Sequence, residues 1–153
     1  MFQMPSFNPN DPKYYSCWCG SHVTKLSRVL IVLTLVFYLL YLFSQSRLGI
    51  AGLLITVIGV FAVFQEQRIV LIFYIVVTIV HSIIVAIHYI LAAAYLQRTD
   101  PEFKKHKDLI LPTLVGLILV EFLILVPFLI TYSKLAQFIK DRENAQQLPV
   151  LYK

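Results

Sequence analysis

The residues best suited to chemistry in this chain are a carboxylate and two imidazoles inside long apolar stretches. Glu121 is the one charged residue between 109 and 133, and His81 and His88 lie in an uncharged stretch over 69–97. A charged group near the bilayer centre costs about 3 kcal/mol, so it usually faces the inside of a helix bundle and has a partner. Histidine titrates near neutral pH and burial raises the pKa of a carboxylate, so this chemistry would be proton transfer or gating.

The two histidines belong to a polar stripe. Tyr74, His81, His88 and Tyr95 recur every seven residues, which returns to nearly the same helix face after two turns. At about 1.5 Å per residue, His81 and Glu121 lie within one turn of the same depth in antiparallel helices, with His88 about two turns further on. We therefore expect Glu121 to lie beside His81 or His88.

Two interpretations of this polar cluster stay open. In one, its hydrogen bonds hold two helices together, each worth about 0.6 kcal/mol on average. In the other, a protonation-sensitive pair gates or relays a proton, as in a small proton-coupled carrier or carrier subunit. Transporters normally have broken helices or repeated halves, so we favour the first. Pro112 and Pro127 bracket the last apolar stretch, and a kink at Pro127 beside Glu121 would indicate a cavity there.

Enzyme motifs do not occur in the sequence: it has no Gly-rich phosphate loop, nucleophile elbow or two-histidine metal motif. We expect a non-enzymatic protein with no catalytic residues and no cofactor. Cys17, Cys19 and His22 offer three metal ligands, but a closed structural zinc site needs four, so no metal is expected. We favour S-acylation of Cys17 and Cys19, which precede an apolar helix by fewer than ten residues; unmodified thiols are the alternative.

The elements that carry these groups follow from composition. Of 153 residues, 59% are hydrophobic and 14% are charged, whereas a soluble domain has about 25% charged residues. A membrane span needs about 20 mostly apolar residues, and backbone hydrogen bonding in lipid requires such spans to be helical. The sequence predicts four transmembrane helices, at 26–43, 48–64, 69–96 and 109–135.

The expected fold is an all-α membrane protein, a four-transmembrane-helix antiparallel bundle with both termini cytoplasmic. Links of four residues after the first two helices force neighbouring helices to run antiparallel. Eight Lys or Arg residues on the side of the termini, against five on the other, favour a cytoplasmic location for that side. The expected domains are an N-terminal tail (1–25), the transmembrane domain (26–135) and a C-terminal tail (136–153).

Small residues mark a packing face on the second predicted helix. Gly49, Gly52, Thr56 and Gly59 recur at spacings of three and four residues. Close backbone contact at such faces drives much of helix association in lipid. We favour packing against the first or third helix of the same chain, with a homodimer face as the alternative.

The residues around the first predicted helix resemble a known family. An aromatic-rich start is followed by the Cys17-x-Cys19 cluster and then by Gly20-x-His22-Val23. Over 14–31 this resembles the lysosome-associated tetraspanning (LAPTM-type) family, as a divergent nematode-like member. The resemblance implies residence in late endosomes or lysosomes, cytosolic tails, and a role in sorting or regulating other membrane proteins or transport.

The expected function is that of a non-enzymatic four-pass endolysosomal membrane protein that sorts, scaffolds or regulates other membrane proteins or transport. The alternatives are the proton-coupled carrier and a membrane-shaping tetraspan scaffold, with the plasma membrane or Golgi as other locations. Expected partners are the lipid bilayer and other membrane proteins, not nucleic acid. The segment from Tyr132 to Leu135 fits a tyrosine-based sorting signal. We prefer an interfacial tyrosine beside a lysine, Lys134, that extends toward the head groups.

Overall fold

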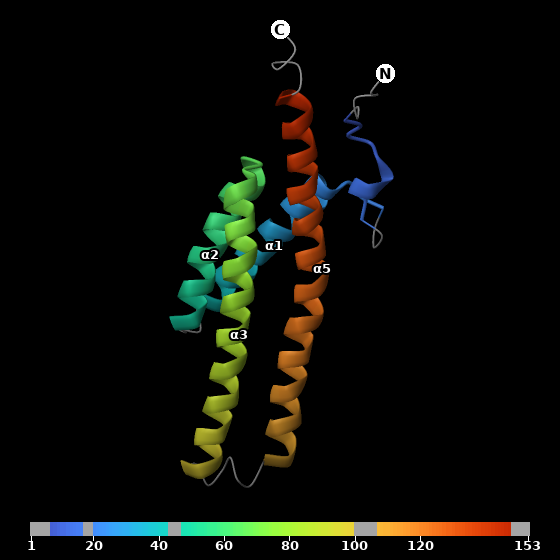
Figure 1. Ribbon diagram of the computed structural model, residues 1–153. Helices are drawn as coiled ribbons and strands as arrows, with labels where there is room; N and C mark the ends of the chain where they lie inside the picture. The colour runs from blue at the N-terminus through green and yellow to red at the C-terminus, as the bar shows by residue number, and fades with distance from the viewer. Residues whose placement is uncertain (1–6, 17–19, 43–46, 100–106, 148–153) are drawn as a thin grey trace.

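The computed structural model describes residues 7–16, 20–42, 47–99 and 107–147, and these are almost entirely helical (Figure 1). A short 3₁₀ turn, η1, precedes four α-helices with these bounds: η1 Pro12–Tyr14, α1 Val23–Leu42, α2 Arg47–Phe64, α3 Arg68–Thr99 and α5 Lys107–Gln147. The four predicted apolar helices are thereby confirmed. The first three are right to within three residues at each end.

The surfaces of these helices are strongly apolar. α1, α3 and α5 contain segments long and apolar enough to cross a membrane, and α2 contains a shorter apolar segment, Leu48–Phe64. Large apolar side chains are exposed on every helix, as Leu33 (59%), Leu54 (62%) and Leu123 (72%) illustrate. A soluble protein rarely exposes so much contiguous apolar surface, because water would have to cover it. The structure is therefore compatible with an integral multi-pass membrane protein.

Helices that follow one another in the sequence pack side by side and run antiparallel. α1 packs on α2, α2 on α3 and α3 on α5, and α1 also packs on α5. In Figure 1, α1 crosses the bundle obliquely, and the long α3 and α5 run well past the α1–α2 hairpin toward one end of the bundle. The C-terminal end of α5, the described segment before α1 and the α2–α3 link lie toward the other end, which we call the terminal end.

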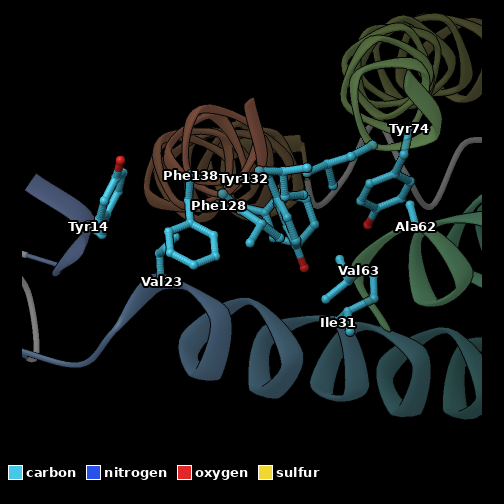
Figure 2. Close-up of a cluster of buried hydrophobic side chains, with 12 residues drawn as sticks. Tyr14, Val23, Ile31, Ala62, Val63, Tyr74, Phe128, Tyr132 and Phe138 are labelled. Atoms are coloured by element: carbon cyan, nitrogen blue, oxygen red, sulfur yellow. The ribbon is translucent and has the colours of Figure 1, made fainter. Parts of the chain in front are cut away.

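The core sits in the half of the bundle nearest the terminal end. All four helices and the N-terminal segment contribute to it (Figure 2), through Tyr14, Val23, Ile31, Ala62, Val63, Leu71, Tyr74, Phe128, Tyr132, Leu135, Phe138 and Ile139. It contains edge-to-face aromatic pairs: the ring centroids of Phe128 and Tyr132 are 4.3 Å apart, and those of Tyr74 and Tyr132 are 5.6 Å apart. Aromatic pairs at these distances are favourable beyond the area they bury.

The small-residue face of α2 packs inside the chain. A Cβ on Gly52 would lie 2.1 Å from Cε1 of Tyr38 on α1, and one on Gly59 would lie 2.5 Å from the Tyr74 ring on α3. Gly49 and Thr56 are also buried. The face is therefore occupied by side chains of α1 and α3, as the favoured interpretation expects.

The last helix is longer than the sequence predicts. The last helix was expected to end at Leu135, but α5 continues to Gln147 because Phe138 and Ile139 extend its buried face at three- and four-residue spacing. The N-terminal segment packs against this extension through Tyr14, which is 2% exposed. The last helix therefore extends past its predicted end, and the division into two tails and a transmembrane domain stays a prediction.

Candidate functional site

The polar stripe of α3 is divided between two environments. Tyr74 and His81 are buried, and the His81 ring contacts Tyr38 on α1 with centroids 6.1 Å apart. His88 and Tyr95, further along α3, are exposed. The first half of the stripe therefore packs between helices, and the second half lies outside that packing.

Glu121 is half-buried on α5, and its partner is Ser82 rather than either histidine. The Ser82 side chain hydrogen-bonds to the Glu121 carboxyl group. Successive residues point about 100° apart around a helix, so Ser82 faces α5 while His81 faces α1. The predicted depth match holds, because Ser82 is the next residue after His81. The predicted side-chain pairing of Glu121 with His81 or His88 is not what the structure shows.

The two prolines lie inside α5 instead of bracketing it. The helix continues through Pro127, whose carbonyl oxygen accepts a hydrogen bond of 2.8 Å from the Thr131 hydroxyl. Threonine hydroxyls in membrane helices commonly bond back to the carbonyl four residues earlier, as this one does; the carbonyl that loses its N–H partner to Pro127 is that of Leu123. Pro127 therefore does not interrupt the helix beside Glu121.

A cluster of charges at the terminal end was not anticipated from the sequence. Glu66 lies in the α2–α3 link and accepts hydrogen bonds from two arginines. Nη2 of Arg28 on α1 donates to its Oε1 at 3.1 Å, and Nη1 of Arg142 on α5 donates to its Oε2. Its φ of 52° is a left-handed conformation that costs a non-glycine residue about 1–2 kcal/mol. One carboxylate thus joins three elements; we call Arg28, Glu66 and Arg142 the Glu66 cluster.

The N-terminal segment is bound to α5 by a second group of contacts. Tyr14 donates to Oδ2 of Asp141 at 2.6 Å, and Lys13 Nζ contacts the same oxygen at 2.9 Å. Lys134 Nζ donates to the carbonyl oxygen of Tyr15 at 3.1 Å. Burial, together with the hydrogen bond to Asp141, raises the pKa of Tyr14. These contacts hold the segment before α1 against the extension of α5.

The His22 ring lies against aromatic rings, and both of its nitrogens lie within hydrogen-bond distance of oxygen atoms. Nδ1 lies 2.8 Å from the Thr24 hydroxyl oxygen and Nε2 lies 3.0 Å from the carbonyl oxygen of Pro9, while the ring contacts Phe138. Cys17 and Cys19 lie outside the described residues, so their acylation stays a prediction. Within the described ranges, no three His, Cys, Asp or Glu side chains are placed to hold a metal ion.

The proposed sorting signal is buried. Tyr132 is 0% exposed and Leu135 is 1% exposed, and the Tyr132 hydroxyl donates to the carbonyl oxygen of Ser27 at 3.3 Å (Figure 2 shows the ring between α5 and α1). An adaptor that binds both side chains in an extended peptide cannot reach them in the folded chain. The Lys134 ammonium donates a hydrogen bond to the carbonyl oxygen of Tyr15, and the preferred interpretation, an interfacial tyrosine beside a lysine that extends toward the head groups, stays a prediction.

Comparisons with known proteins found no match among protein-family models, curated proteins or solved structures. The resemblance to the lysosome-associated tetraspanning family over 14–31 therefore remains a prediction from those residues. The fold and the placement of the polar residues define an all-helical protein compatible with a multi-pass membrane location.

Proposed function

We propose that this protein is a non-enzymatic, four-pass membrane protein of the endolysosomal system, with both termini cytosolic, that sorts, scaffolds or regulates other membrane proteins. Its apolar helices support the membrane location. The excess of Lys and Arg on the side of the termini supports the orientation. The resemblance over 14–31 supports the compartment.

The observation that best supports a role in binding other membrane proteins is that α3 and α5 extend beyond the α1–α2 hairpin (Figure 1). Large apolar side chains there are open on both helices, with exposed fractions of 63% for Leu91 on α3 and 51% for Val115 on α5. In a bilayer such faces pack on lipid chains or on the transmembrane helices of other proteins. The internal small-residue face is already filled, so the long helices supply the surface for partners.

Location is the first test of this proposal. The full chain with a C-terminal fluorescent tag, expressed at its native level, is imaged together with markers of acidic organelles and of the plasma membrane. We expect most of the signal in late endosomes and lysosomes. A protein confined to the plasma membrane would contradict the endolysosomal role.

The partner surface has a matched test. Leu91→Ala with Val115→Ala alters the extension, and Leu33→Ala with Val36→Ala alters comparably exposed side chains on α1. Proximity labelling of neighbouring membrane proteins should fall at least twofold for a subset of them in the first variant and remain unchanged in the second. Equal labelling patterns in the two variants and the unaltered protein would argue against the α3–α5 extension as the partner surface.

A second candidate, a proton-coupled carrier, is favoured by one observation: a half-buried carboxylate, Glu121, lies between α3 and α5 and is bonded to Ser82. The test is flux in liposomes that contain the purified protein and a pH gradient. A carrier predicts pH-dependent flux that is lost in Glu121→Gln and reduced in His81→Ala. Flux that is equal in Glu121→Gln and the unaltered protein would exclude this role for the carboxylate.

A further inference from the structure

Three arginines come from three helices to one region at the terminal end. Arg28 on α1 and Arg142 on α5 pair with Glu66, and Arg68 is the first residue of α3, two positions after Glu66. Among the described residues, no carboxylate lies within ion-pair distance of Arg68. Two arginines thus share one carboxylate, and a third follows it by two positions in the chain, which leaves an excess of positive charge around the link.

The remaining charges at this end do not cancel that excess. The described parts 7–16, 20–28, 65–68 and 134–147 contain seven Lys or Arg residues and four Asp or Glu residues. Asp141 is already engaged by Lys13, and no carboxylate in the described chain pairs with Lys25 or Lys140. The surface around the Glu66 cluster is thus available to an anion.

The cluster also lies beside the apolar surface of the helices. Val29, next to Arg28, is 56% exposed, and Ile69, next to Arg68, is 84% exposed. The Arg28 guanidinium lies over the Phe64 ring, 5.6 Å from its centroid. Charged groups directly beside lipid-facing side chains lie at the depth of lipid head groups, where basic pockets between transmembrane helices bind anionic lipids.

We propose that the Glu66 cluster and Arg68 bind the phosphorylated head group of an anionic lipid. An arginine has five N–H donors in a planar fork that matches phosphate oxygens. Arg28 and Arg142 each use one terminal nitrogen for Glu66, so the other donors remain for a ligand, and Glu66 holds the two guanidinium groups in place. This site is additional to the proposed partner surface and does not depend on the compartment.

A diffuse attraction between basic residues and any anionic membrane is the competing explanation. It predicts similar binding of every lipid of equal charge and similar losses wherever a basic residue is removed from the surface. A built site instead predicts a preference for a phosphomonoester, because that group presents several oxygens to the guanidinium forks. It also predicts that the losses are confined to the arginines near Glu66.

The experiment measures lipid binding to the purified full chain in detergent by native mass spectrometry. The probes are dioctanoyl phosphatidic acid, which is a phosphomonoester, dioctanoyl phosphatidylserine and inorganic phosphate. The two lipids are compared at a pH below the second phosphate pKa of about 6, so that each carries about one negative charge. The variants are Arg68→Gln, which leaves both ion pairs of Glu66 intact, and Arg142→Gln. The matched control is Arg98→Gln, in the last turn of α3 at the opposite end. Circular dichroism melts of each variant check that the fold is retained.

We expect the phosphorylated lipid to bind at least fivefold tighter than phosphatidylserine or inorganic phosphate. Arg68→Gln should weaken it about fivefold, the effect of one basic residue near a membrane surface, and Arg98→Gln should stay within twofold of the unaltered chain. The site would be overturned if Arg68→Gln and Arg98→Gln lost equal affinity for the phosphorylated lipid, or if Arg68→Gln lost none. Equal binding of phosphatidylserine would reduce it to diffuse attraction, and equal binding of inorganic phosphate would overturn the lipid assignment.

Discussion

Arg142, near the end of α5, pairs with Glu66 in the α2–α3 link across 76 residues of sequence. This contact joins the first and second halves of the bundle at the point where the apolar helices give way to charged residues. Arg28 completes the cluster from α1. The extension of α5 is therefore part of the folded bundle, and several consequences of this packing can be measured.

Replacing Glu66 should weaken the bundle. Glu66→Gln keeps the shape of the side chain but removes both ion pairs, so we expect a loss of about 1 kcal/mol, the scale for partly exposed pairs. Thermal melts of the protein in detergent measure it, with Glu143→Gln as the control on the same helical extension. A double-mutant cycle with Arg142→Gln should give a coupling energy of similar size. A coupling of zero would contradict the contact.

The glycines of α2 and α5 should respond oppositely to an added methyl group. Gly52→Ala places a Cβ against the Tyr38 ring, and we expect a loss of about 1–3 kcal/mol from overpacking. Gly116→Ala meets no atom within 4 Å, so the better helix propensity of alanine should leave stability unchanged or raise it by up to about 1 kcal/mol. Equal melting temperatures for the two variants would argue against the packing of α2 on α1.

Tyr132 should behave as a core residue and not as a sorting signal. Tyr132→Phe removes one buried hydrogen bond to Ser27, so the free energy of unfolding should fall by about 1 kcal/mol. Tyr132→Ala removes the whole ring and should cost about 3–5 kcal/mol. Tyr132→Phe, which stays folded, should keep the location of the unaltered protein. Redistribution of this variant to the cell surface would instead support the sorting signal.

The contact between the N-terminal segment and α5 should weaken at alkaline pH. The hydrogen bond to Asp141 raises the pKa of Lys13, and burial raises that of Tyr14, so both groups bind their protons more tightly in the folded state. Their contribution to stability is complete below the unfolded pKa values of about 10 and is lost as pH rises through the folded values. Melting temperatures from about pH 9 to about pH 11 should fall more steeply for the unaltered chain than for Lys13→Met with Tyr14→Phe. If the melting temperatures of the two proteins fell equally with pH, the contribution of Lys13 and Tyr14 to this contact would be contradicted.

The apolar helices were predictable because a chain that crosses a bilayer must satisfy its own backbone hydrogen bonds. Long uncharged stretches must be helical in a bilayer, and short links must make neighbours antiparallel. The extension of α5 beyond Leu135 was missed because Lys140 and Asp141 interrupt the apolar composition. A signal was present, since Phe138 and Ile139 continue the spacing of Leu135 on one face.

The contacts of the polar groups were less predictable. Counting residues gives the depth of a side chain in the membrane, so Glu121 was correctly placed near the level of His81. Counting does not give the rotation of one helix against the next, and that rotation turned Ser82 instead of His81 toward α5. Glu66 was read as part of a plain link, because its role depends on a left-handed backbone and on arginines from two other helices.

The central claim, that α5 crosses the membrane and the termini share one side, is tested most directly by cysteine accessibility. Cys17 and Cys19 are first changed to Ser, and a single cysteine is introduced as Gln65→Cys, Asn144→Cys or Thr99→Cys, all at exposed positions. A membrane-impermeant maleimide is then added to sealed vesicles. We predict that Gln65→Cys and Asn144→Cys react from the cytosolic side and that Thr99→Cys reacts only from the other. Reaction of Thr99→Cys and Asn144→Cys from the same side would contradict the four-pass arrangement.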